Sequence, residues 1–300
     1  MTNVRYVITC ILVSLAMAGA VPASAQTPSK LPVVATFSIL ADFARNVGGD
    51  RIDVAALVGP DGDTHVYQPK PADAEKLSAA RLIVVNGLGL EGWIDRLIKA
   101  SGAKAPVIVA TMSINPQKMR EEGRIGLDPH AWQSIANAKI YVANIRDGLI
   151  AADPGGEAAY RANAEHYLGK LDALEKEVLA EIAKIPPARR QIITTHDAFG
   201  YFGTAYGFRF IAPEGVSTET EASARDVAKI IRQIEAEKIP AVFLENVTDP
   251  RLARNIAAES GATIGGTLYS DALSPPNGPA STYIDMMRNN VRELSAALAK

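Results

Sequence analysis

The longest regular pattern of apolar and polar positions in the chain lies between residues 153 and 187. The segment 157–185 contains no proline, and its one glycine is Gly169. Apolar residues recur at steps of three or four: Tyr160, Ala164, Tyr167, Leu171, Leu174, Val178, Ile182 and Ile185. This spacing predicts a helix with one buried face, roughly 45 Å long. Pro154 and Pro186 are typical of its two ends.

Short apolar runs alternate with amphipathic segments on both sides of this helix. Before it, we expect strands at 33–37, 52–58, 82–85 and 107–110, and helices at 39–47, 71–80, 91–100 and 133–150. After it, we expect strands at 191–194, 208–211, 241–244 and 263–268, and helices at 199–206, 224–237, 250–260 and 283–298. The stretch before Asp128 is expected to be irregular. Alternation of this kind predicts an α/β fold with mainly parallel sheets flanked by helices.

The repetition of this pattern divides the chain into parts. We expect an N-terminal α/β lobe at 31–152, a long linking helix at 153–187 and a C-terminal α/β lobe at 188–300. The alternative is one long helix packed across a single domain. We favour two lobes because the helix is longer than one small domain is wide, and because similar patterns lie on either side.

Residues 1–25 have the pattern of a secretory signal. Arg5 precedes an apolar run, and Ala23-Ser24-Ala25 follows it as a cleavage site. The alternative is an N-terminal membrane anchor, although the run is short for a span. Cys10, the one cysteine, would leave with the signal, and its surroundings do not resemble a lipoprotein cleavage box. An exported protein without disulfides suits the bacterial periplasm.

Composition indicates the class of protein and argues against one class of partner. The 300 residues are 48% apolar and 21% charged, as in a globular protein with a substantial core. A formal net charge of -2 argues against nucleic acid as a partner.

Three of the four histidines follow predicted strands. His65, His130 and His196 occupy such positions, and ligand groups in open α/β sheets gather at the carboxyl ends of strands. Imidazole suits zinc, and also copper, nickel and iron. A carboxylate at a similar place would complete a metal site: Asp271 fits, and Glu245 is its competitor.

The histidines and their acidic neighbours could also have purely structural roles. A lone histidine near a turn is often a surface or capping residue. His166 lies in the long helix beside the apolar stripe, and we interpret it as structural or solvent-facing. Asp63, Asp128 and Asp197 neighbour the three histidines. They could accept hydrogen bonds from ring N–H groups, or they could be turn formers.

Four motifs carry a resemblance to a known family. They are Gly59-Pro60 with Asp63-Thr64-His65 and Tyr67-Gln68-Pro69; Asp128-Pro129-His130-Ala131-Trp132; Thr195-His196-Asp197-Ala198-Phe199-Gly200-Tyr201-Phe202; and Tyr269-Ser270-Asp271. In this order and spacing they resemble the ligand motifs of the zinc and manganese solute-binding proteins of bacterial ABC importers (ZnuA/TroA-like, cluster A-I). The resemblance covers essentially the whole chain after residue 25.

The resemblance implies a fold, a function and a ligand set. It implies two lobes joined by one long rigid helix, with a metal ion held between them and delivered to a membrane permease. His65, His130, His196 and Asp271 would be the metal ligands. The protein would be a monomer and not an enzyme, and a periplasmic metallochaperone could load it.

The identity of the metal depends on finer features. Manganese members often have glutamate at the third position, so His196 favours zinc as the transported ion. Residues 111–127 contain no histidine, which resembles the short-loop, AztC-like members and leaves manganese, and also iron, as alternatives. Two other classes of protein are alternatives: a zinc-dependent hydrolase with Glu245 as its base, and a binder of a metal chelate. Three histidines and Asp271 would fill a tetrahedral zinc site and leave no position for a substrate.

Overall fold

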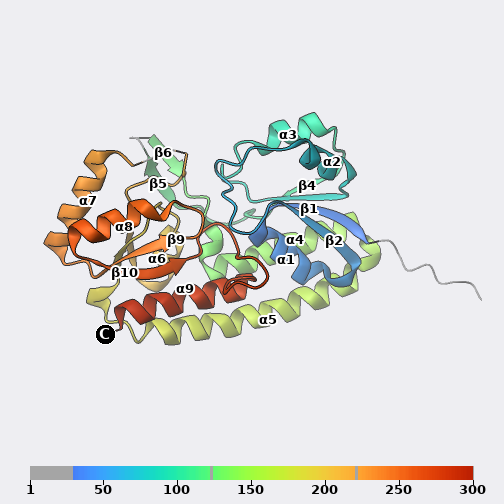
Figure 1. Ribbon diagram of the computed structural model, residues 1–300. Coiled ribbons are helices and arrows are strands. Elements are labelled where there is room, and N and C mark those ends of the chain that lie inside the picture. Colours follow the sequence, from blue (N-terminus) through green and yellow to red (C-terminus); the bar gives the residue numbers. More distant parts are fainter. Residues whose placement is uncertain (1–29, 122–123, 220–221, 300) are drawn as a thin grey trace, which may run out of the picture.

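The computed structural model describes residues 30–299 except 122–123 and 220–221, and Figure 1 shows its arrangement. The expected signal at 1–25 lies outside the described residues. Two sheets stand side by side, each with its own helices, and one long helix runs beneath both (Figure 1). Within the described part, no helix has the length and apolar character needed to cross a membrane.

The first sheet has the strand order β2-β1-β3-β4, and all its strands are parallel. Its strands are β1 (Leu31–Phe37), β2 (Ile52–Val58), β3 (Leu82–Val85) and β4 (Val107–Val109). The helices of this lobe are α1 (Ser38–Gly48), α2 (Pro71–Ala79), α3 (Ile94–Ser101) and α4 (Ile135–Ala152). Strand β3 is buried throughout, as expected for a parallel sheet covered on both faces.

The second sheet repeats this architecture with the order β10-β9-β7-β8, again parallel. Its strands are β7 (Gln191–Ile193), β8 (Arg209–Ile211), β9 (Ala241–Glu245) and β10 (Thr263–Leu268). Its helices are α6 (Gly200–Tyr206), α7 (Ala224–Glu237), α8 (Pro250–Ser260) and α9 (Tyr283–Leu298). The prediction of an α/β fold with two lobes of mainly parallel sheets is therefore confirmed.

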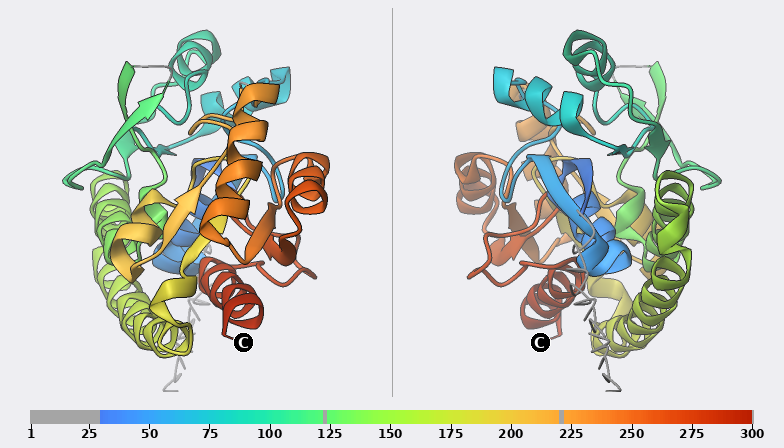
Figure 2. Two further views of the ribbon diagram at one scale, coloured as in Figure 1. Left: turned by 90° about the vertical axis from the view of Figure 1, so that its left-hand side faces the viewer. Right: turned by 90° about the vertical axis from the view of Figure 1, so that its right-hand side faces the viewer.

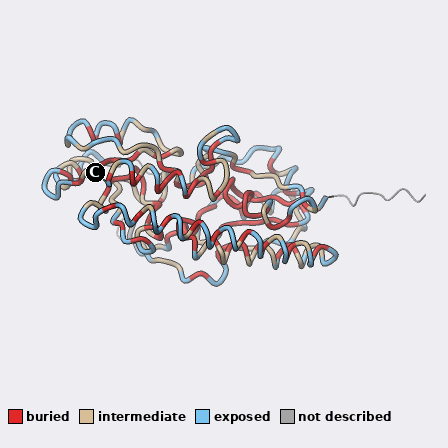
Figure 3. Tube along the Cα trace, turned by 90° about the horizontal axis from the view of Figure 1, so that it is seen from below, coloured by how far each residue is buried: buried red, intermediate tan, exposed pale blue. Residues whose placement is uncertain are grey.

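The long helix is α5 (Glu157–Ile182). All eight apolar positions that predicted it are buried, and buried and exposed positions alternate along its length (Figure 3). It packs against α1 and α4 in the first lobe and against α9 in the second. Figure 2 shows α5 and α9 side by side at the base of the molecule. This one helix therefore packs against both lobes.

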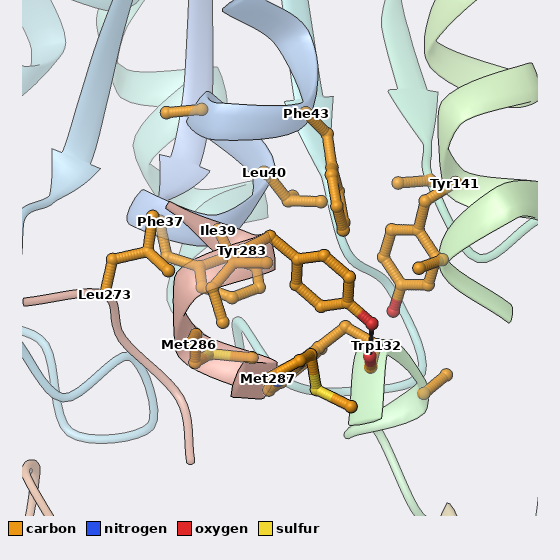
Figure 4. Packing of buried hydrophobic residues seen from close by; sticks show 14 of the residues in the cluster. Phe37, Ile39, Leu40, Phe43, Trp132, Tyr141, Leu273, Tyr283, Met286 and Met287 are labelled. Carbon is orange, nitrogen blue, oxygen red and sulfur yellow. Dashed lines mark hydrogen bonds between the residues drawn. The ribbon is translucent and has the colours of Figure 1, made fainter. Parts of the chain in front are cut away.

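A continuous apolar core joins the two lobes. Phe43 of α1 packs its ring against Tyr141 of α4 and Tyr283 of α9, with centroids 5.8 and 4.8 Å apart (Figure 4). The hydroxyl of Tyr283 donates to the carbonyl of Trp132 at 2.7 Å. A separate, smaller cluster fills the space between the second sheet and α7 and α8. A core shared between lobes predicts a stiff junction rather than a freely opening hinge.

The expectation of an irregular stretch before Asp128 was wrong in part. Strands β5 (Lys118–Glu121) and β6 (Arg124–Leu127) form an antiparallel pair there. The strands are short, and two of their apolar residues are exposed: Ile125 is 68% and Leu127 42% exposed. Such short strands with exposed apolar residues give no hydrophobic alternation that would mark them in the sequence.

Candidate metal centre

His65 stands on the loop after β2. Its backbone N–H donates to Oδ1 of Asp63 at 2.8 Å, so Asp63 serves as a turn former rather than as a partner of the ring. Nε1 of Trp93 donates to the carbonyl of Thr64 at 2.9 Å and holds the same loop against α3. The His65 side chain is 5% exposed, and those of His130, His196 and Asp271 are fully buried.

His130 lies three residues after the end of β6 and not, as expected, after the fourth strand of the parallel sheet, because the β5–β6 pair intervenes. Oδ1 of Asp128 accepts from the His130 backbone N–H at 2.9 Å and lies 2.8 Å from ring Nδ1. Nδ2 of Asn86, at the end of β3, donates to the carbonyl of Pro129 at 3.0 Å. The ring is therefore fixed from its own loop, with Nε2 facing away from Asp128. Asp128 is the one acidic neighbour of the three whose expected ring contact is found among the described residues.

His196 follows β7 and is held by Glu245 at the end of β9. Oε1 of Glu245 accepts from the backbone N–H groups of Thr195 and His196 at 2.7 and 2.9 Å. Oε2 lies 2.6 Å from Nδ1 of His196. Glu245 thus stands behind the ring and does not compete with Asp271 for a place at the centre. The sequence placed Glu245 at a strand end but gave no sign of which way it points.

Asp271 follows β10, on a loop held from the other lobe. The carbonyl of Ser270 accepts from Nε1 of Trp132 at 2.9 Å and from Nε2 of Gln133 at 2.7 Å. The N–H of Leu273 donates to Oγ of Ser38 at 2.9 Å. Sequence reasoning missed these supports. The position of Trp132 and Gln133 directly after the second histidine motif was the available signal.

These four side chains meet at one point between the lobes. His65 Nε2 lies 3.2 Å from His130 Nε2 and 3.3 Å from Oδ2 of Asp271. His196 Nε2 lies 3.1 Å from the same oxygen, and His130 Nε2 lies 3.5 Å from Oδ1 of Asp271. One ligand atom from each residue falls within 4.8 Å of all the others. His166 is exposed on α5, away from this centre.

The electrostatics of the centre favour positive charge. Burial alone would lower the pKa of His130, but the carboxylates of Asp271 and Asp128 outweigh it and raise the pKa to about 9. For His196, burial alone would likewise lower the pKa, but Glu245 and Asp271 raise it well above its ordinary value. Burial would raise the pKa of Asp271, yet His130 and His196 hold it well below its ordinary value. The buried carboxylates of the centre therefore favour positive charge on or between the histidine rings.

The arrangement fits a divalent metal ion. Oδ1 of Asp271 is buried and has no hydrogen-bond partner among the described residues, which is costly unless a cation binds it. Three imidazole nitrogens and a carboxylate in contact distance form a donor set typical of zinc and of neighbouring transition metals. Two α/β lobes closing on such a set define a metal-binding protein of the two-lobe, solute-capturing class.

Comparisons with known proteins give the family. Residues 33–297 match the family described as ZnuA, zinc-uptake complex component A, periplasmic. The chain belongs to this family, whose members are metal-binding solute-binding proteins of ABC transporters and not enzymes. The hydrolase alternative is thereby set aside.

Individual relatives are named for different metals. The iron-binding protein YfeA of Yersinia pestis is 36% identical over 267 residues, which are 89% of this chain and 86% of that protein. The manganese-binding lipoprotein MntA of Halalkalibacterium halodurans is 35% identical, covering 90% and 89%.

Solved structures agree with the fold. The periplasmic zinc-binding protein TroA of Treponema pallidum superposes with a TM-score of 0.85 at 31% identity, covering 90% of this chain and all of that one. A Mn-bound periplasmic metal-binding protein of Candidatus Liberibacter asiaticus gives 0.80 at 33% identity, covering 89% and 98%. Similar folds thus include a protein named for zinc binding and one solved with manganese bound.

Proposed function

We propose that this protein captures zinc outside the cytoplasm between its two lobes, through His65, His130, His196 and Asp271, and delivers it to the permease of an ABC importer. The convergence of these four ligand atoms within 4.8 Å carries the proposal. The family supplies the importer as partner. Zinc is the transported ligand and not a resident cofactor.

The choice of zinc rests on the donors. Nitrogen-rich sites bind zinc more tightly than manganese, whereas carboxylate-rich sites suit manganese. Manganese and iron are the alternatives, because relatives are named for both. The segment between β4 and His130 contains no histidine, which supports the short-loop, AztC-like subtype.

Competition titration tests the metal assignment. Metal-free protein is titrated with zinc and with manganese against a chelator of known affinity, and bound metal is counted per chain. We expect one site per chain and tighter binding of zinc. Tighter binding of manganese would overturn the zinc assignment, and absence of stoichiometric binding of either ion would overturn the site.

The form of the protein in the cell is a second part of the proposal. We propose that residues 1–25 are cleaved and that a soluble monomer is released into the periplasm, with lobes at 31–152 and 188–300 joined by 153–187. The surroundings of Cys10 support cleavage over lipid attachment. Mass spectrometry of the exported protein would show a mature chain that starts near Gln26, and a lipid-modified Cys10 would refute this. Loading by a metallochaperone is consistent with a buried site.

A further inference from the structure

The two carboxylate oxygens of Glu245 contact different groups. Oε1 accepts from two backbone N–H groups, those of Thr195 and His196, at 2.7 and 2.9 Å. Oε2 faces Nδ1 of the His196 ring at 2.6 Å. The residue is 3% exposed, and it comes from β9, whereas His196 follows β7. The two amides therefore fix which oxygen faces the ring.

The short distance to the ring requires a proton. An unprotonated ring nitrogen and a carboxylate oxygen repel each other, so at 2.6 Å a hydrogen must lie between them. Imidazole is ordinarily the stronger base of the two, which places this hydrogen on Nδ1. Neither atom has a regular hydrogen bond among the described residues. The two atoms are within hydrogen-bond distance but are not well aligned, as is often the case at functional sites before the ligand binds. A proton on Nδ1 leaves the lone pair of a neutral ring on Nε2.

We propose that Glu245 is a positioning residue that selects the Nδ1–H tautomer of His196 and so directs the Nε2 lone pair at the metal. This inference rests on the proposed role of His196 as a ligand. Carboxylates that hold a metal-binding histidine in this way tune affinity through ring orientation and ligand basicity. Here the carboxylate belongs to β9 and the histidine follows β7, so the two strands together determine the orientation of the His196 ring.

A substitution of Glu245 by Gln isolates this effect. The two backbone N–H groups require an acceptor, so the side-chain oxygen of Gln takes the place of Oε1. The amide NH₂ then occupies the place of Oε2 and donates to Nδ1 of His196. Nδ1 becomes the acceptor, and a neutral ring must carry its proton on Nε2, where the metal should bind. Glu245→Gln therefore retains the shape of the side chain but selects the Nε2–H tautomer of His196, which cannot bind the metal through Nε2.

Asp128 provides a matched control. Its Oδ1 alone contacts both the backbone N–H and Nδ1 of His130. In Asp128→Asn the amide oxygen can take that place, and the NH₂ group replaces Oδ2. Both variants exchange one carboxylate for an amide beside a histidine of the centre, yet only Glu245→Gln reverses the tautomer.

The experiment compares zinc affinity for wild type, Glu245→Gln, Asp128→Asn and His196→Ala. We expect Glu245→Gln to weaken zinc binding by about 10- to 100-fold and Asp128→Asn to weaken it clearly less. His196→Ala should weaken zinc binding more than either amide variant, because it removes the ligand itself. Equal affinity losses in the two amide variants would overturn the proposal.

Two further measurements separate the possible failures. If His196→Ala binds zinc like wild type, the proposed metal site itself is wrong, whatever Glu245 does. ¹⁵N NMR of the zinc-bound wild type, with His196 signals assigned by their loss in His196→Ala, should show the proton on Nδ1. A proton on Nε2 would overturn the tautomer assignment even if Glu245→Gln did not fold. Melting of the metal-free variants shows which of them fold.

Discussion

The indole nitrogen of Trp132, in the first lobe, lies 2.9 Å from the carbonyl oxygen of Ser270, in the second, and donates a hydrogen bond to it. Gln133 donates a second bond to the same oxygen at 2.7 Å. Ser270 directly precedes Asp271. The carboxylate ligand is therefore positioned by the lobe that carries His65 and His130.

The other side of the Asp271 loop is held in the same way. The N–H of Leu273 donates to Ser38, and its carbonyl accepts from the N–H of Asp61, both at 2.9 Å. Ser38 and Asp61 belong to the first lobe. The loop of Asp271 is thus tied to the first lobe on both sides of the ligand, although it follows β10 of the second lobe and also bonds to Asn246 there.

Trp132→Phe should weaken both the fold and the metal site. The change removes one buried hydrogen bond and part of a buried ring, which corresponds to a loss of about 1–3 kcal/mol in the free energy of unfolding. Zinc affinity should fall as well, because Asp271 loses one of its supports. Chemical denaturation and zinc titration measure the two effects.

Tyr160→Phe is the control for this comparison. It removes the 2.7 Å hydrogen bond from Tyr160 to Asp153, at the far end of α5. It should lower stability by about 1 kcal/mol and leave zinc affinity unchanged. Unchanged zinc affinity in Trp132→Phe would show that the Ser270 contact does not position Asp271.

His196→Ala and His166→Ala should differ sharply. His196 is fully buried and lies 3.1 Å from Asp271, whereas His166 is exposed on α5. We expect zinc affinity to collapse in the first variant and to stay at the wild-type value in the second, as measured by competition with a chelator. Similar losses in both would mean that the ligand assignment is wrong.

Regular elements and most positions of the proposed ligands were accessible from the sequence for physical reasons. The apolar spacing of α5 specified its buried face, and strand ends marked His65 and His196 because parallel strands bring their carboxyl ends to one edge. His130 instead follows β6 of the antiparallel pair, which the sequence did not predict. The bounds of α7, α8 and β10 agree with the expected ones.

Other features depend on tertiary contacts that leave no local pattern. The direction of Glu245 is set by the amides of Thr195 and His196, 50 and 49 residues away. Helix α3 begins at Ile94 rather than Glu91, because the Glu91 carboxylate accepts the backbone N–H groups of Asn86 and Gly87. The β5–β6 pair escaped prediction because its strands are short and its apolar residues Ile125 and Leu127 are exposed.

Two glycines in helices should respond in opposite ways to alanine. Gly169 is exposed within α5, and a Cβ there meets no heavy atom within 4 Å. Gly169→Ala should stabilise the protein by roughly 0.5–1 kcal/mol, because alanine loses less backbone entropy in a helix. A Cβ at Gly203 in α6 would lie 2.8 Å from the carbonyl oxygen of Phe208. Gly203→Ala should lower the melting temperature, and a rise would contradict the packing of α6 on β8.

Asp42 of α1 is a buried carboxyl at the junction of the lobes. Its Oδ2 accepts from the N–H of Tyr283, the first residue of α9, at 3.0 Å and from the hydroxyl of Tyr167 of α5 at 3.4 Å. Burial raises the pKa of Asp42 to about 6, although the Tyr283 N–H, Arg45 and Tyr167 lower it and Asp285 adds a smaller rise. The charged form is therefore disfavoured in the folded state.

The sign of the effect on stability follows from this pKa. In the unfolded chain Asp42 titrates near its ordinary pKa of 3.8, so the folded protein binds more protons between that pH and about 6. Its contribution to stability is fully present below about pH 4 and is lost as pH rises through 6. The loss corresponds to at most about 3 kcal/mol at pH 7.

Asp42→Asn should therefore stabilise the metal-free protein at pH 7.5 relative to wild type, and the difference should close as pH falls to 4.5. The amide oxygen of Asn can still accept from Tyr283. Asp172→Asn gives the opposite sign, because the hydrogen bond from Lys139 lowers the pKa of Asp172. That variant should be slightly less stable at pH 7.5 and equal to wild type in acid. Melting temperatures measured with a chelator present test both, and a constant difference between Asp42→Asn and wild type would show that Asp42 does not titrate in this range.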